Sequence, residues 1–266
     1  MSNDIVVVGR NRLTDVVPAS GVRATIASPT PNQDPDFPLS NILEPQPEKF
    51  WKCGTPFPAT FDVDLFVGGP TTVRAFGVTR NRQHGGGVGI TSVEVFTSTS
   101  ATYPPSTWTS RGTITLTPAD NDKGLLASLA NVRQVRFAVA ASGRYSCRFW
   151  IGVQADYLEL GSEGAEVTEG VVRARTAVRR TYVGSDLYGE LATSLAVRRR
   201  RFRFSHAFAA STAKAGWLSS MGGSLFMLYR DGVWYECMHV DSSFVTERAP
   251  GATALDTHGV HLVSRP

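Results

Sequence analysis

Apolar residues at every second position between Tyr145 and Val153 constrain the fold more than any other feature of this sequence. Successive side chains of an extended chain point to opposite faces, whereas a helix needs apolar residues three or four positions apart. Nine residues with period two therefore predict a β-strand with one strongly apolar face. The segment from Arg133 to Val139 alternates in the same way, so it predicts a second strand.

The rest of the sequence also favours short strands. Twenty-five glycines and fifteen prolines are spread along the chain, as in proteins with many strands and turns. Apolar residues make up 42% of the 266 residues, which is enough for a packed core, and the length suits two domains of ~100–150 residues each. The predicted fold class is mainly all-β, with one helical turn expected at Leu125–Leu129.

Three features between residues 38 and 65 predict one wall of a β-sandwich. Asn41 lies in a proline-bounded turn, where its carboxamide can bond nearby backbone groups. Phe50 and Trp51 form an apolar plug between two proline-rich loops. The run from Phe61 to Leu65 alternates apolar residues with aspartates, which is the period of a half-buried strand.

This order of elements resembles the discoidin-like (galactose-binding-domain-like) jelly rolls, in particular those in tail proteins of long-tailed bacteriophages. There a Ser-Asn-Leu-Leu-like turn precedes a tryptophan and then a strand reading apolar-Asp-apolar. Here the matching residues are Ser40-Asn41-Ile42-Leu43, Trp51 and Phe61-Asp62-Val63. The resemblance covers roughly residues 22–160 and implies a jelly-roll β-sandwich as an N-terminal domain over residues 1–160.

A different module is expected after a Glu- and Gly-containing linker or exposed loop at Ser162–Gly170. It contains a strand at Ala196–Ser205, a short helix at Thr212–Met221, and an Asp-Gly turn between the two aromatic runs of residues 225–238. This order resembles the C-terminal part of phage tail-tip or baseplate proteins that carry a discoidin-like domain in front. It implies a smaller β-rich docking or assembly domain over residues 161–266.

Positive charge is concentrated in one segment of the chain. The formal net charge is +4, but nine arginines and only two acidic residues lie between Arg173 and Arg203, which gives a local net charge of +7. Arginine is favoured in ion pairs between subunits, so we expect this segment to contact neighbouring subunits. The candidate interface residues are Arg173, Arg175, Arg179, Arg180, Arg199, Arg201 and Arg203.

Nucleic acid is a disfavoured partner for the same segment. In a single-strand binding site, arginines would supply phosphate contacts and phenylalanine rings would supply faces for base stacking. On a strand, Phe202 and Phe204 share the face opposite Arg199, Arg201 and Arg203, so the rings would point to the core. A solvated arginine face is the remaining alternative.

Loop aromatic residues are the best candidates for contact with a sugar. Tyr103 and Trp108 lie in the Ser-, Thr- and Pro-rich loop 98–110, and His84 lies in the Gly-rich loop 82–87. In discoidin-like modules such loops often bind ligands, so the resemblance permits this role. A tryptophan in a proline-rich loop can equally fold back onto the sandwich. The loop around His84 lacks the ending of a phosphate-binding loop.

No catalytic, cofactor-binding or metal-binding residues are predicted. The acidic turn at residues 120–124 lacks the ligand pattern of a calcium loop. His258 and His261 are three apart on an expected strand, so they face opposite sides. None of the five histidines belongs to a hydrolase or zinc-protease motif. The expected protein is not an enzyme and needs no cofactor.

The cysteines and the N-terminus bear on where the protein is made. Cys53, Cys147 and Cys237 are far apart and form no C-x-x-C pair, so buried free thiols in a reducing cytoplasm are expected. Residues 1–4 do not begin a secretory signal, and no apolar stretch approaches the ~20 residues of a membrane span. Synthesis in the host cytoplasm and incorporation into a virion tail fit these features.

The sequence therefore predicts a structural component of a phage tail tip or baseplate. Its expected partners are other tail or baseplate proteins, including ring or hub subunits, and further copies of itself in a homo-oligomer within the virion. The alternative function is a carbohydrate-binding module that contacts host-surface glycans.

Overall fold

The computed structural model shows an all-β protein. It describes residues 5–9, 11–14, 24–27, 34–44, 49–53, 59–65, 71–80, 89–154, 157–159, 166–173, 177–183, 186–193, 198–209, 225–230, 232–239, 247–248 and 255–264. Strands make up 63% and helical turns 5% of the structure, and the described part has no helix of seven or more residues. The predicted all-β class is confirmed. The helix predicted at Thr212–Met221 lies outside the described residues.

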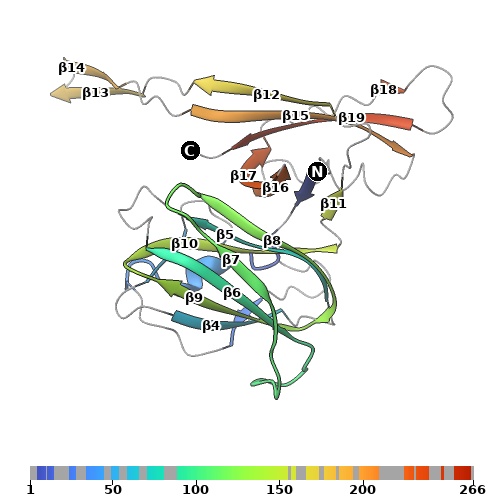
Figure 1. Cartoon of the computed structure of the whole chain (residues 1–266). Helices are drawn as coiled ribbons and strands as arrows, with labels where there is room; N and C mark the ends of the chain where they lie inside the picture. The colour runs from blue at the N-terminus through green and yellow to red at the C-terminus, as the bar shows by residue number, and fades with distance from the viewer. Residues whose placement is uncertain are drawn as a thin grey trace. The chain divides into compact units, whose positions relative to one another are not determined.

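Two antiparallel sheets form a β-sandwich (Figure 1). The five-stranded sheet has the order β2 (Thr25–Ile26), β4 (Ala59–Asp64), β9 (Gln134–Ala141), β6 (Ile90–Ser98) and β7 (Thr109–Thr115). The four-stranded sheet has the order β3 (Trp51–Cys53), β10 (Tyr145–Val153), β5 (Thr71–Arg80) and β8 (Asp122–Val132). The finer prediction of jelly-roll connectivity stays a prediction.

An aromatic cluster fills the space between the two sheets. Trp51 has no exposed surface and meets Phe61, Tyr145 and Phe149 with ring centroids 5.5, 5.3 and 6.2 Å away. Phe137 stands 4.8 Å from Phe149 and 5.4 Å from Phe61. These are the residues of the predicted plug and alternating strands, so the sequence pattern located the core correctly.

The proline-bounded turn is a short 3-10 helix, η1 (Leu39–Leu43). The side-chain amide of Asn41 donates a hydrogen bond to the carbonyl oxygen of Phe50 at 3.0 Å, and Asn41 is buried. This bond ties the turn to the residue before Trp51, so the predicted role of Asn41 is confirmed.

The helical turn predicted at Leu125–Leu129 is wrong, because this segment lies inside β8. Leu125, Ala127 and Leu129 pack against the core, whereas Leu126 is 39% exposed. This alternation has period two, and β8 pairs with β5 along its length. The consecutive leucines suggested a helix, but pairing with β5 satisfies their backbone groups in a sheet.

The outer face of the four-stranded sheet is covered by β1 (Ile5–Val8) and the hairpin of β16 (Leu225–Arg230) and β17 (Val233–His239). A second apolar cluster lies there, formed by Val6, Val8, Ala75, Trp150, Met227 and Trp234. All nine residues of β10 are buried as a result. β16 and β17 are neighbours, as the predicted hairpin requires, and Gly232 between them has a φ of 82°, which suits glycine.

Glycines on β5, β8 and β10 make room for these covering strands. Gly124 lies so close to the Trp234 indole that an added Cβ would be 2.7 Å from it and 2.8 Å from the carbonyl oxygen of Phe76. An added Cβ on Gly152 would be 2.2 Å from a methyl carbon of Val8. The close packing of the second cluster therefore depends on the missing side chains at these positions.

The chain divides into two compact units that are discontinuous in sequence. The first unit contains residues 1–162 and 224–236, and the second contains residues 163–223 and 237–266. The hairpin of β16 and most of β17 belongs to the first unit, which also contains β11 (Tyr157–Glu159) paired with β1. The predicted domain boundary between residues 160 and 161 stays a prediction.

The second unit is described by the pairing of its strands. It contains β12 (Glu166–Arg173), β13 (Ala177–Val183), β14 (Asp186–Thr193), β15 (Arg198–Ala209), β18 (Glu247–Arg248) and β19 (Leu255–Ser264). The strands β12, β15 and β19 are neighbours in that order, and β18 and the end of β17 also pair with β19. The linker predicted at Ser162–Gly170 is wrong from Glu166 onward, because β12 begins there.

Candidate functional site

The loop 99–108, between β6 and β7, is fixed to the outer face of the five-stranded sheet. Asp62 of β4 and Arg136 of β9 are opposite each other in register, on the face away from the core. The Arg136 Nε lies 2.7 Å from Oδ1 of Asp62, and its Nη2 lies 2.9 Å from Oδ2. Both loop aromatics contact this ion pair. The hydroxyl of Tyr103 donates to Oδ2 of Asp62 at 3.0 Å, and the Arg136 guanidinium lies 4.4 Å from the ring centre of Trp108.

The electrostatics of this cluster follow from the shared carboxylate. Asp62 is 1% exposed although its strand is at the surface of the sandwich. Burial, and then the hydrogen bond to Asp62, raises the pKa of Tyr103 above its ordinary value. The same carboxylate raises the pKa of Arg136 through its hydrogen bonds. Tyr103 therefore stays a neutral donor and Arg136 stays charged at physiological pH.

A glutamine holds the backbone of the same loop. The side-chain amide of Gln134, next along the outer face of β9, donates to the carbonyl oxygens of Ser100 at 3.3 Å and Thr102 at 2.9 Å. Backbone and side chains of the loop are therefore both anchored to the sheet. An anchored loop presents its aromatic rings in one arrangement, which lowers the entropy cost of binding a ligand.

The structure brings two of the three predicted glycan-contact residues together. Trp108 folds back onto Arg136 and is half-buried, while Tyr103 is 40% exposed. His84 lies outside the described residues. Rings beside a fixed guanidinium can contact both the apolar face and the hydroxyl groups of a sugar.

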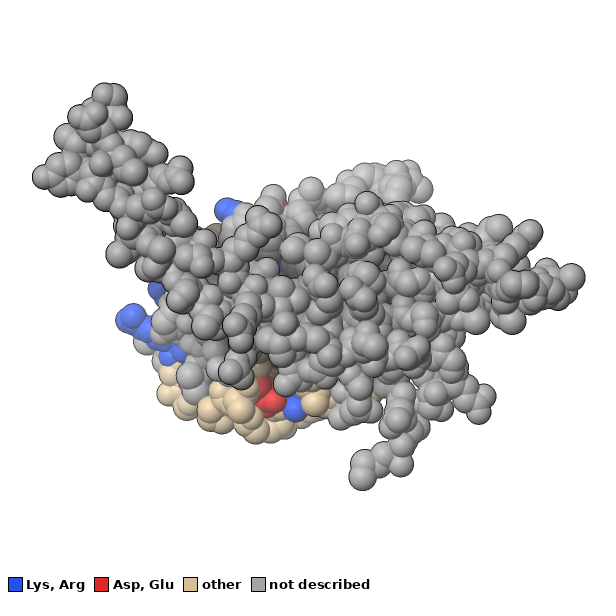
Figure 2. Space-filling view, turned by 90° about the horizontal axis from the view of Figure 1, so that it is seen from above, with Lys and Arg blue, Asp and Glu red and all other residues tan. Residues whose placement is uncertain are grey.

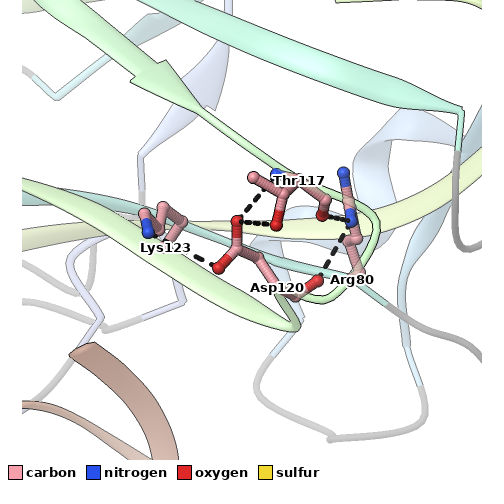
Figure 3. A network of polar contacts seen from close by, with 4 residues as sticks. All are labelled: Arg80, Thr117, Asp120 and Lys123. Carbon is pink, nitrogen blue, oxygen red and sulfur yellow. Dashed lines mark hydrogen bonds and ion pairs between the residues drawn. The ribbon is translucent and has the colours of Figure 1, made fainter.

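The acidic turn at residues 120–124 is held in place by polar contacts with Thr117, Lys123 and Arg80 (Figure 3). The carboxylate of Asp120 accepts hydrogen bonds from the backbone nitrogen of Thr117 at 2.7 Å and from its hydroxyl at 2.9 Å, and it lies 3.4 Å from Nζ of Lys123. Arg80 donates to the carbonyl oxygens of Thr117 and Asp120 at 2.6 and 3.0 Å. Burial acts to raise the pKa of Asp120, but the Thr117 bonds and Lys123 outweigh it and lower the pKa.

The candidate interface arginines lie in the second unit, where backbone pairing places six of the seven. Arg173, the last residue of β12, is opposite Arg198, the first residue of β15. Between these positions the chain forms the ribbon of β13 and β14, in which Arg180 is opposite Glu190. Arg199, Arg201 and Arg203 occupy alternate positions of β15, and Arg179 lies on β13. Arg175 lies outside the described residues.

Two of the cysteines are buried free thiols, as predicted. Cys53 and Cys147 lie on the neighbouring strands β3 and β10 in the main core. Burial raises the pKa of both thiols, which keeps them protonated and unreactive. The side chain of Cys237 lies outside the described part of the structure.

Sequence reasoning missed two ion pairs, among the described residues of the first unit, that each bury a carboxylate. Asp62 pairs with Arg136, and Arg148 of β10 pairs with Glu236 of β17. Three of these four residues stand at outward positions of strands, where charge normally indicates solvent.

The described surface that is visible in Figure 2 consists mostly of uncharged residues. Both positively charged (Lys, Arg) and negatively charged (Asp, Glu) residues appear on it.

No protein-family model and no curated protein matches this chain. Within the described residues, His, Cys, Asp and Glu side chains do not gather into a group that could hold a metal ion. The described part also lacks a helix that is long and apolar enough to cross a membrane.

Proposed function

We propose that this protein is a structural subunit of a phage tail tip or baseplate and assembles with other virion proteins. The observation that carries the proposal is an arm that consists of β12, β15 and the β13–β14 ribbon, which lies between them in sequence. The register of β12 with β15 ends where Arg173 meets Arg198, and the chain between them forms the two-stranded β13–β14 ribbon. The ribbon therefore extends from the end of the β12–β15 pair (Figure 1).

Such a ribbon needs a partner. Two-stranded hairpins are at best marginally stable in water, and β13 and β14 pair with none of the other described strands. Like charges directly opposite each other, as at Arg173 and Arg198, are also destabilising. An acidic surface on a neighbouring subunit would relieve both costs, because it would cover the ribbon and neutralise the arginines.

Charge reversal in the arm tests this proposal. We expect Arg201→Glu with Arg203→Glu to block incorporation into particles while the isolated chain keeps its β-sheet circular dichroism. The matched control is Lys49→Glu with Arg144→Glu, since both residues are exposed in the first unit. Complementation of a phage lacking this protein, with electron microscopy of lysates, measures the effect. Normal particles from the arm variant would contradict the proposal, and steeply salt-dependent binding of DNA by the arm would favour nucleic acid instead.

The cluster of Tyr103, Trp108, Arg136 and Asp62 favours a second function, binding of host-surface glycans. The exposed ring of Tyr103 and the half-buried ring of Trp108 lie on one anchored loop. The guanidinium of Arg136, on the strand below the loop, is fixed by Asp62. Trp108→Ala is expected to weaken glycan binding roughly 5- to 150-fold, by analogy with the stacking of a nucleic-acid base on an aromatic ring, which contributes about 1–3 kcal/mol. Titration with host polysaccharide measures it, with Arg74→Ala on the other sheet as the control. No binding at millimolar sugar, or equal binding by both variants, would remove this function.

A further inference from the structure

A row of polar residues crosses the outer face of the four-stranded sheet beneath the β16–β17 hairpin. Arg148 of β10, Thr79 of β5 and Asp122 of β8 are partners in register, so their side chains share this face. Glu236 of β17 packs onto the row. Glu236 is 1% exposed and Arg148 is 7% exposed, and Oδ1 of Asp122 is buried although the residue as a whole is only partly buried.

A second carboxyl group lies beside the Arg148–Glu236 ion pair in this cluster. Arg148 Nη2 pairs with Oε1 of Glu236. The backbone nitrogen of Glu236 donates to Oδ2 of Asp122 at 2.8 Å, which brings the second carboxyl group against the first pair. If both carboxyl groups are ionised, the side chains of Arg148, Glu236 and Asp122 together carry a net charge of −1.

The other described groups nearby do not neutralise that charge. The hydroxyl of Thr79 faces Asp122 and also lies 3.9 Å from the sulfur of Met227 on β16. Lys123 pairs with Asp120 in the adjacent turn. Arg80 is opposite Cys147 in register, on the face toward the main core, where it donates to the carbonyl oxygens of Thr117 and Ile90.

We propose that the hairpin 225–236 is a pH-sensitive latch, held on the sandwich by one proton bound to Asp122 beside the Arg148–Glu236 ion pair. Glu236 has the arginine, so the proton resides on Asp122. Loss of this proton leaves two buried carboxylates facing one cation, and the hairpin that carries Glu236 can move away to separate them. This inference does not depend on the proposed function.

The titration of Asp122 supports the direction of the switch. Burial, and then the negative charge of Glu236, raises the pKa of Asp122 from 3.8 to about 7. The docked hairpin therefore binds one more proton than the released hairpin between these two values. Docking is strongest at acidic pH and weakens as the pH rises through that window.

Hydrogen exchange of the full chain tests the latch. The amides of Met227 and Leu228, on β16, report hairpin opening after correction for the intrinsic exchange rate. One linked proton predicts that the opening constant of the wild-type hairpin rises about tenfold per pH unit between pH 5 and 6.5 and levels off above pH 7.5. Asp122→Asn, which mimics the protonated group, is expected to show no such rise.

Asp36→Asn is the matched control, since it removes an exposed carboxyl group from the first unit and leaves the Lys123–Asp120 ion pair intact. It should keep the wild-type pH profile. A flat wild-type profile, or a profile unchanged by Asp122→Asn, would overturn the latch. If Asp122→Asn fails to fold, carbon-13 NMR of the wild-type Asp122 carboxyl group decides: a midpoint near pH 7 supports the latch, and one below pH 5 overturns it.

Discussion

Alanine in place of Trp51 is expected to destabilise the sandwich by about 3–5 kcal/mol, the usual cost of removing a large buried aromatic side chain. Trp51 has no exposed surface and contacts three other aromatic rings between the two sheets. Small domains are stable by about 5–15 kcal/mol, so this loss removes a large part of the folding free energy. Urea unfolding of the full chain measures the change as a lower midpoint with an unchanged slope.

Two further variants make this prediction sharper. The indole nitrogen of Trp51 is buried and has no hydrogen-bond partner among the described residues, so Trp51→Phe loses volume but also removes an unsatisfied donor. We expect Trp51→Phe to cost much less than Trp51→Ala. Trp108→Ala removes the same side chain at a half-buried site and should cost about 1 kcal/mol, the size of an exposed cation–π contact. Equal costs at positions 51 and 108 would contradict the assigned core.

The alternating pattern of the sequence predicted this core because period two directly reports which residues share a face. Phe149 and Trp51 could be assigned to the interior without any knowledge of topology. The pattern failed at Leu125–Leu129, where small and large apolar residues follow each other and fit a helix as well as an edge strand. Pairing with β5, a contact distant in sequence, decided between the two.

The covering of the second face could not be read from the sequence. Gly124 and Gly152 look like ordinary turn or strand glycines, and only the structure shows Trp234 and Val8 packed against them. Trp150, at an outward position of an otherwise alternating strand, was the available signal that this face is also buried. A large aromatic residue there indicates a second packing partner more often than solvent.

The same limit applies to the candidate sites. Tyr103 and Trp108 were identified from their loop. Their partners come from distant strands: Asp62 is about 40 residues before Tyr103, and Arg136 is about 30 residues after Trp108. Charged residues at outward strand positions are normally solvated, so the sequence gives no reason to pair them. Burial of an outward aspartate becomes visible only when the loop that covers it is placed.

Arg148→Met is expected to cost about 3–5 kcal/mol at pH 8, because it leaves Glu236 and Asp122 buried without their guanidinium. The cost should fall at pH 5–6, where the two carboxyl groups can take up protons instead of repelling each other. Urea unfolding at both pH values measures this difference. Arg144→Met is the control, since Arg144 is exposed in the turn before β10 and its replacement should change stability little.

A combined variant distinguishes the stability that is lost through unbalanced buried charge from the stability that is lost through poorer packing. Adding Glu236→Gln and Asp122→Asn to Arg148→Met removes the buried negative charges, so it should recover most of the stability lost at pH 8. Methionine keeps much of the arginine stem, which limits the packing loss to a smaller term. An Arg148→Met cost that is the same at pH 5 and pH 8, with no recovery in the triple variant, would mean that the arginine acts through packing alone. That result would also remove the electrostatic basis of the latch, because the latch requires that the carboxyl pair, and not the apolar contacts of Trp234, set the pH dependence of hairpin docking.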